Sequence, residues 1–215
     1  DTQTPDFASQ FRDGAEILRI AKNQDTSFFD NFFDFWKLGI GHILGGADHV
    51  LFVLSLLLVF VSWREILKLT ATFTVAHSIT LILGGQGIVT LSPRVVEPFI
   101  AFSIAYVAFT SVFMAGKKFV GESRGKLAMV FFFGLFHGLG FAGLLAEIQV
   151  PADTFISSLF AFNIGIEFGQ IFIVLCALPL IYFCKEKSWY GHAVKGAAIL
   201  VIALGLFWGL QRIFE

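Results

Sequence analysis

The sequence has few charged residues and very few cysteines. Only 14% of its 215 residues are charged, against about a quarter in soluble domains, and 56% are hydrophobic. This composition excludes an ordinary soluble domain and predicts an integral membrane protein. A net charge of −1 also argues against a nucleic-acid partner, which would require a basic surface. The two cysteines, Cys176 and Cys184, would lie about 12 Å apart along a helix, which is too far for a disulfide.

Several sequence motifs are absent as well. There is no P-loop, so the chain carries no ATPase motor of its own, and there is no HExxH motif of zinc proteases. The CxxCH motif for covalent haem attachment is also missing. The chain begins at Asp1 without an initiator Met. We interpret this start as the mature end left by removal of a signal peptide, although a truncated chain would begin in the same way.

Six hydrophobic segments approach or exceed the ~20 residues that a helix needs to cross a bilayer. We predict an all-α, polytopic membrane protein, in which residues 35–215 form a compact bundle of six transmembrane helices. The first span is over-long and contains Gly45-Gly46, where we expect a break. The predicted spans are 36–62, 66–84, 95–115, 126–147, 154–184 and 193–213.

Residues 1–34 form the second predicted unit, an extracytoplasmic N-terminal segment. Apolar residues recur there at helical spacing, and seven acidic residues stand against three basic ones. We predict an amphipathic helix at the membrane surface, with an acidic collar that concentrates cations as the alternative. The loops at 62–68, 116–126 and 185–195 hold two, four and three Lys or Arg, whereas the two opposite loops hold only Arg94. Because cytoplasmic loops are enriched in Lys and Arg, both termini are predicted to lie outside a bacterial inner membrane.

Ionisable side chains occur inside the predicted spans. Each costs about 2.5–3.5 kcal/mol at the bilayer centre on insertion scales, so such residues are usually functional. At 1.5 Å per residue, all but one lie about 16–20 Å from an end of their span, near the bilayer midplane. The exception is His42, which we expect nearer the outside, where it would meet an incoming ion first. The six predicted metal ligands are His42, Asp48, His49, His77, His137 and Glu167.

Polar residues share helix faces with these candidate ligands. Thr74 and Ser78 lie on the face of His77, whereas Asn163 and Gln170 lie on the face of Glu167. We predict that these four residues hold the ligating side chains in place. Asp48 has two alternatives, because after a break at Gly45-Gly46 it either ligates the metal or only caps the next helix.

The residue types indicate which ligand the site would take. Imidazole and carboxylate groups suit nickel, zinc, cobalt, copper(II) or iron, and the lack of thiolates argues against copper(I). We therefore predict a divalent transition-metal ion and a membrane permease that binds it near the midplane. Two alternatives stay open, an intramembrane metalloenzyme and a haem-binding or accessory subunit of a larger membrane complex. Besides the metal ion, the expected partners are the lipid bilayer and either a second copy of the chain or a larger complex.

Two signatures carry a resemblance to a known family. The pattern His42-x5-Asp48-His49 resembles the H-x5-D-H signature of the HupE/UreJ family. FGLFHGLGFAG at 133–143 is similar to that family's second signature, which centres on F-H-G. TVAHSIT at 74–80 and NIGIEFGQ at 163–170 resemble the larger branch, whose members have additional extracytoplasmic sequence. The resemblance covers roughly residues 36–210.

This resemblance implies a function and a set of site residues. HupE/UreJ proteins are associated with nickel supply to hydrogenase and urease and are regarded as nickel permeases, so nickel becomes the favoured ion. Carried over by motif, the site residues are His42, Asp48, His49 and His137. Shorter members place a Glu soon after F-H-G, but here the next Glu is ten residues away, and Glu167 is expected to supply the acid instead.

Overall fold

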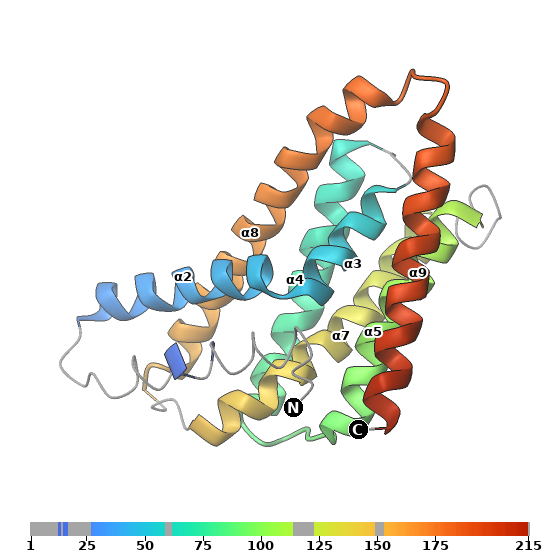
Figure 1. Cartoon of the computed structure of the whole chain (residues 1–215). Helices are drawn as coiled ribbons and strands as arrows, with labels where there is room; N and C mark the ends of the chain where they lie inside the picture. Colours follow the sequence, from blue (N-terminus) through green and yellow to red (C-terminus); the bar gives the residue numbers. More distant parts are fainter. Residues whose placement is uncertain are drawn as a thin grey trace.

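The computed structural model describes residues 13, 15–16, 27–58, 62–113, 123–148 and 153–214. Within these ranges every regular element is a helix, which confirms the all-α prediction (Figure 1). The amphipathic helix predicted within residues 1–34 falls largely outside the described residues. The long helices are α2 (Phe28–Gly45), α3 (Ala47–Leu57), α4 (Trp63–Gly85), α5 (Pro93–Phe113), α7 (Ser123–Ile148), α8 (Phe155–Cys184) and α9 (Tyr190–Phe214).

Five of these helices, α4, α5, α7, α8 and α9, are long and apolar enough to cross a membrane. Helices α2 and α3 pass the same test only as a pair bent by 69°, so the described residues contain six spans when this pair counts as one. Figure 1 shows α2 running across the bundle while α4, α8 and α9 run along it. The six-span prediction therefore agrees with the structure, with a sharply broken first span.

The break falls at Gly46, as the paired glycines predicted. The Gly46 backbone is extended (φ −83°, ψ 105°), and its N–H still donates to His42 O at 2.9 Å. A Cβ at this position would lie 2.8 Å from His49 Nδ1 and 2.9 Å from His42 O. Glycine is therefore needed here for space, because only a residue without a side chain lets His42 and His49 approach across the bend.

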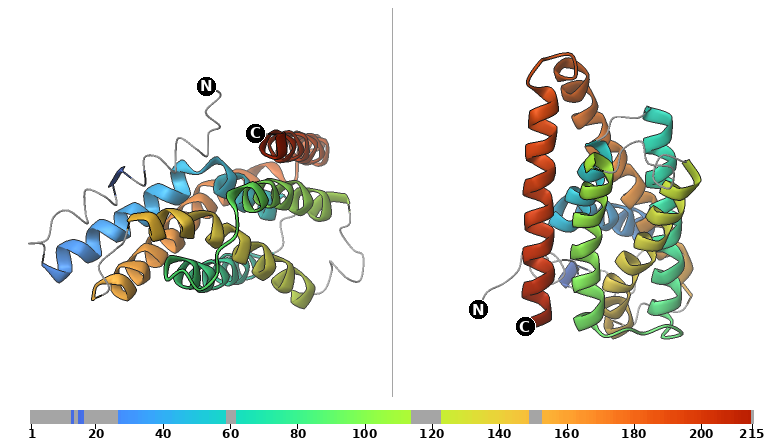
Figure 2. Two further views of the ribbon diagram at one scale, coloured as in Figure 1. Left: turned by 90° about the horizontal axis from the view of Figure 1, so that it is seen from below. Right: turned by 90° about the vertical axis from the view of Figure 1, so that its right-hand side faces the viewer.

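The helices pack in three main pairs, α4 with α7, α2 with α8, and α5 with α9. Figure 2 shows α9 lying alongside α5 in both views. Glycines allow the close approach, as small residues do in membrane bundles. A Cβ on Gly39 of α2 would meet the backbone of Phe162, and one on Gly165 of α8 would meet that of Trp36. The α2–α8 contact therefore holds α2, which runs across the bundle, against α8, which runs along it.

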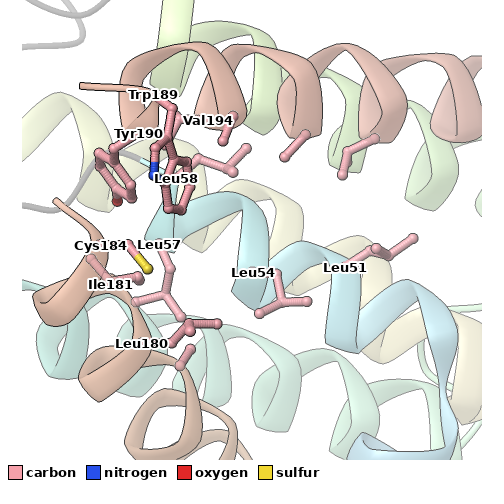
Figure 3. A pocket seen from close by; sticks show the side chains of 14 residues that line it. Leu51, Leu54, Leu57, Leu58, Leu180, Ile181, Cys184, Trp189, Tyr190 and Val194 are labelled. Carbon is pink, nitrogen blue, oxygen red and sulfur yellow. The ribbon is translucent and has the colours of Figure 1, made fainter. Parts of the chain in front are cut away.

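An apolar groove of about 390 Å³ lies between α3, α8 and α9 (Figure 3). Leucines of α3, among them Leu51 and Leu54, form one side, and Trp189 and Tyr190 stand at one end. None of the candidate metal ligands lines it. The polar site is thus separate from this groove and lies inside the bundle.

Candidate metal centre

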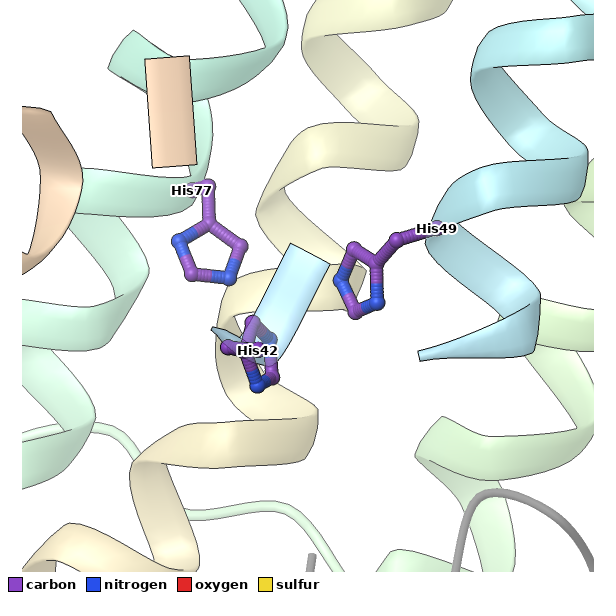
Figure 4. Close-up of side chains that lie close together, drawn as sticks. All are labelled: His42, His49 and His77. Atoms are coloured by element: carbon purple, nitrogen blue, oxygen red, sulfur yellow. The ribbon is translucent and has the colours of Figure 1, made fainter. Parts of the chain in front are cut away.

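Three histidines from three helices meet inside the bundle. His42 comes from the last turn of α2, His49 from the first turn of α3, and His77 from the middle of α4. One nitrogen from each ring can be chosen such that all three atoms lie within 4.8 Å of one another (Figure 4). Nitrogen ligands lie about 2.0–2.1 Å from an ion such as zinc, so small movements of the rings would bring all three into contact with one ion.

The bend between α2 and α3 creates this arrangement. The ring centroids of His42 and His49 are 4.7 Å apart, and each lies 6.2 Å from that of His77. Our prediction that His42 stands apart from the other ligands is therefore wrong. That prediction counted depth along a straight helix, whereas α2 runs across the bundle and places its C-terminal turn against α3 and α4.

Burial and missing hydrogen bonds test whether these residues fit a metal ion. His42, His49 and His77 are at most 6% exposed. His42 Nε2 and both ring nitrogens of His49 make no hydrogen bond within the described residues, and the His77 ring has the Asn163 side chain as a polar neighbour. Buried polar groups are normally hydrogen-bonded, so this many lone imidazole nitrogens at one place fit a ligand that accepts their electron pairs.

Aromatic side chains surround the three rings. Phe141 and Phe162 stack in parallel at 5.0 Å and lie 4.6 and 5.4 Å from the ring of His42. Phe73 stacks on His77 with a centroid distance of 6.0 Å. This apolar wall lowers the local dielectric and limits access of water, which strengthens ion–ligand electrostatics inside the site.

A carboxylate from the N-terminal segment holds His42. Asp13 Oδ2 lies 2.7 Å from His42 Nδ1, and Asp13 is only 2% exposed. With Nδ1 donating to this carboxylate, Nε2 is left as the nitrogen with a free electron pair, the usual arrangement behind a metal-bound histidine. Asp13 was not among the predicted site residues, because a contact across 29 residues leaves no local spacing signal.

His137 of α7 lies beside the three histidines, but it does not belong to the group whose nitrogen atoms lie within 4.8 Å of one another. Its ring centroid is 5.1 Å from that of His49, and its Nε2 lies 3.1 Å from Ser103 Oγ on α5. His137 Nδ1 makes no hydrogen bond within the described residues. It is thus placed to assist the three histidines from the α7 side, and Ser103 is a partner that the sequence did not reveal.

Asp48 neither caps α3 nor joins the three histidines. The cap position of α3 is Gly46, which has no side-chain cap. Asp48 Oδ2 instead accepts a hydrogen bond of 2.9 Å from Arg212 Nη2, and both side chains are at most 3% exposed. The structure therefore corrects the cap alternative for Asp48. Arg212 was overlooked because it stands in the last turn of α9, where a basic residue is typical of a membrane boundary.

Glu167 lies on α8 and contacts α4 one turn from His77. Thr74 Oγ1 lies 2.7 Å from Glu167 Oε2 and 3.1 Å from Gln170 Oε1, so Thr74 connects the two helices. Glu167 is half-buried rather than enclosed with the histidines. The other two predicted supporting residues bond to backbone of their own helices, Ser78 Oγ to Thr74 O at 2.6 Å and Asn163 Nδ2 to Leu159 O at 2.7 Å.

The fold and this site together define an integral membrane protein with a buried histidine centre suited to a transition-metal ion. A family model described as HupE / UreJ protein matches residues 19–212 of the chain. The chain belongs to the HupE/UreJ family, as its two signatures indicated. No curated protein and no solved structure matched the chain in the corresponding comparisons.

Proposed function

We propose that this protein is a permease for a divalent transition-metal ion, with nickel favoured and cobalt, zinc or copper as further candidates. The observation that carries the proposal is the convergence of His42, His49 and His77, whose ligating atoms lie within 4.8 Å of one another inside the bundle. Family membership supports the same proposal, since HupE/UreJ proteins are regarded as nickel permeases.

The donor set suits transport because neutral imidazoles bind an ion without trapping it. Three neutral ligands leave the charge of a divalent ion uncompensated, so the affinity of the site for the ion stays moderate. Moderate affinity suits transport, because conduction requires a site that releases its ion. Asp48 and Glu167 stand near the histidines, each with a partner of its own, and are proposed to receive the ion before or after it occupies the three-histidine site. His137 is proposed as an additional ligand.

The orientation that we propose for the protein rests on the charge of its loops. Lys and Arg are concentrated within residues 62–68, 116–126 and 185–195, at the ends of the helices that flank the α3–α4, α5–α7 and α8–α9 connections, and we propose that this side is cytoplasmic, with both termini outside the inner membrane. The ion would then enter from the side of the N-terminal segment, whose Asp13 contacts His42.

Reconstitution of the purified protein into vesicles tests this proposal. An indicator inside the vesicles should report uptake of nickel, cobalt or zinc above the rate of protein-free vesicles. Elemental analysis of the same protein gives the bound metal. Bound metal without uptake of any ion would favour the metalloenzyme alternative, and a Soret absorption band would favour the haem alternative. Absence of both binding and uptake would rule out a metal permease.

Replacing Asp13 with asparagine is expected to weaken metal binding about 10- to 100-fold, the usual effect of losing a carboxylate that supports a histidine ligand. An amide at this position can donate to His42 Nδ1, which would favour the wrong tautomer of the ring. Titration of purified Asp13→Asn with nickel measures the change. The matched control is Glu16→Gln, which removes an exposed carboxylate of the same segment and should leave the affinity unchanged. Equal affinities for the two variants would contradict the role of Asp13.

A further inference from the structure

A buried ion pair stands next to the histidine centre. Arg212 Nη2 donates to Asp48 Oδ2 at 2.9 Å, and Arg212 Nη1 donates to Glu97 O at 3.1 Å. The guanidinium thus connects α9 to both α3 and α5. Asp48 directly precedes His49, one of the three histidines of the site. The carboxylate next to the site is thus held by a cation of the protein itself.

The charge on Arg212 is permanent, because a guanidinium does not lose its proton in a protein. It lies close enough to His137 to interact with it electrostatically, and the His137 ring is in turn 5.1 Å from that of His49. A fixed positive charge so near the centre repels an incoming cation. It also occupies the carboxylate that would otherwise attract that cation. Arg212 is therefore unfavourable for ion binding, which requires an explanation in a protein built to bind ions.

Stability alone does not supply that explanation. Replacing a buried ion pair with apolar residues of similar volume is often neutral or stabilising, so such a pair is weak evidence for a purely structural role. Helix α9 is already fixed along α5 by close contacts, where a Cβ on Gly205 would lie 2.8 Å from Ala101 O. The attachment of α9 to the bundle thus has a source other than Arg212.

We propose that Arg212 competes with the metal ion for Asp48, and so keeps the affinity of the site low enough for the ion to leave. In the ion-free state Arg212 holds Asp48. An arriving ion draws the carboxylate away from the guanidinium, and Arg212 recovers it when the ion departs. This inference rests on the proposed permease function and adds a residue that sets the affinity of the same site.

The test is a pair of measurements on Arg212→Gln, which removes the charge and keeps a polar side chain. Nickel should bind to this variant about tenfold more tightly than to the wild type, because a nearby positive charge is lost and Asp48 becomes available. Uptake into vesicles should become slower, because release is slowed. Arg212→Lys keeps the charge and should change the affinity less. The control is Arg64→Gln, which removes an exposed arginine that lies over Trp63 and should alter neither quantity.

A purely structural role for Arg212 predicts no gain in affinity. Arg212→Gln would then bind nickel as tightly as the wild type or more weakly. That result in a folded variant would overturn the competition. If the variant does not fold, hydrogen–deuterium exchange on the wild type decides. Nickel should speed the exchange of amides in the last turn of α9 while it slows exchange around His42 and His49. Slower exchange around the histidines with no change in α9 overturns this inference only, whereas wild-type protein that binds no metal overturns the permease as well.

Discussion

Purified His49→Ala protein is expected to bind nickel about 100-fold or more weakly than the wild type and to show no uptake in vesicles. His49 supplies one of the three imidazoles whose nitrogen atoms lie within 4.8 Å of one another, and its removal takes one ligand from that group and leaves a space in the site. The effect should exceed that of Asp13→Asn, because His49 is a proposed ligand whereas Asp13 acts through His42. Equilibrium dialysis followed by elemental analysis gives the affinity of each protein.

His192→Ala is the matched control for this experiment. His192 is an exposed residue in the first turn of α9, distant in sequence from the other histidines, so its loss should leave binding and uptake at wild-type levels. Metal retained at full stoichiometry and affinity by His49→Ala would show that the three-histidine site is not where the ion binds. Equal losses in both variants would instead point to histidine binding at the surface.

Gly39→Ala is expected to destabilise the protein by about 1–3 kcal/mol, the usual cost of inserting a methyl group into a closely packed contact. Its Cβ would overlap the backbone of Phe162 on α8, which cannot move aside as a flexible side chain can. Helix α2 would have to shift, and His42 would move with it. Thermal unfolding in detergent should show a lower midpoint, and nickel titration a weaker affinity.

Gly41→Ala, two residues further along α2, provides the comparison. A Cβ at Gly41 meets nothing within 4 Å, and alanine favours the helical state over glycine by about 1 kcal/mol. This variant should therefore be as stable as the wild type or slightly more stable. If both variants unfold at the same temperature, the close approach of α2 and α8 does not limit stability.

Local properties of the sequence predicted the elements of the fold. Hydrophobic runs of sufficient length predicted the spans, because a helix that crosses lipid must satisfy its backbone within one continuous apolar segment. The adjacent glycines predicted the break, because glycine interrupts a helix. The chain does leave the helix at Gly46, where a side chain would collide with His49. The cost of placing ionisable groups in lipid indicated that the histidines are candidate ligands, although it gave no contact between them.

The partners of these histidines could not be predicted in the same way. Asp13 reaches His42 across 29 residues, and Arg212 reaches Asp48 across 164, so neither pair leaves a periodic signal. The position of His42 was predicted wrongly because the bend of 69° rotates α2 out of the direction of the other helices. Counting residues along the chain measures depth only in a straight helix.

The sequence by itself determined that this is a helical membrane protein and where its first span breaks, and it indicated which ionisable side chains are candidates for a site. Only the tertiary structure decided that His42, His49 and His77 form one group while Asp48 is held by Arg212. The physical reason is that composition and periodicity act over a few helical turns, whereas ligand geometry depends on how separate helices bend and pack.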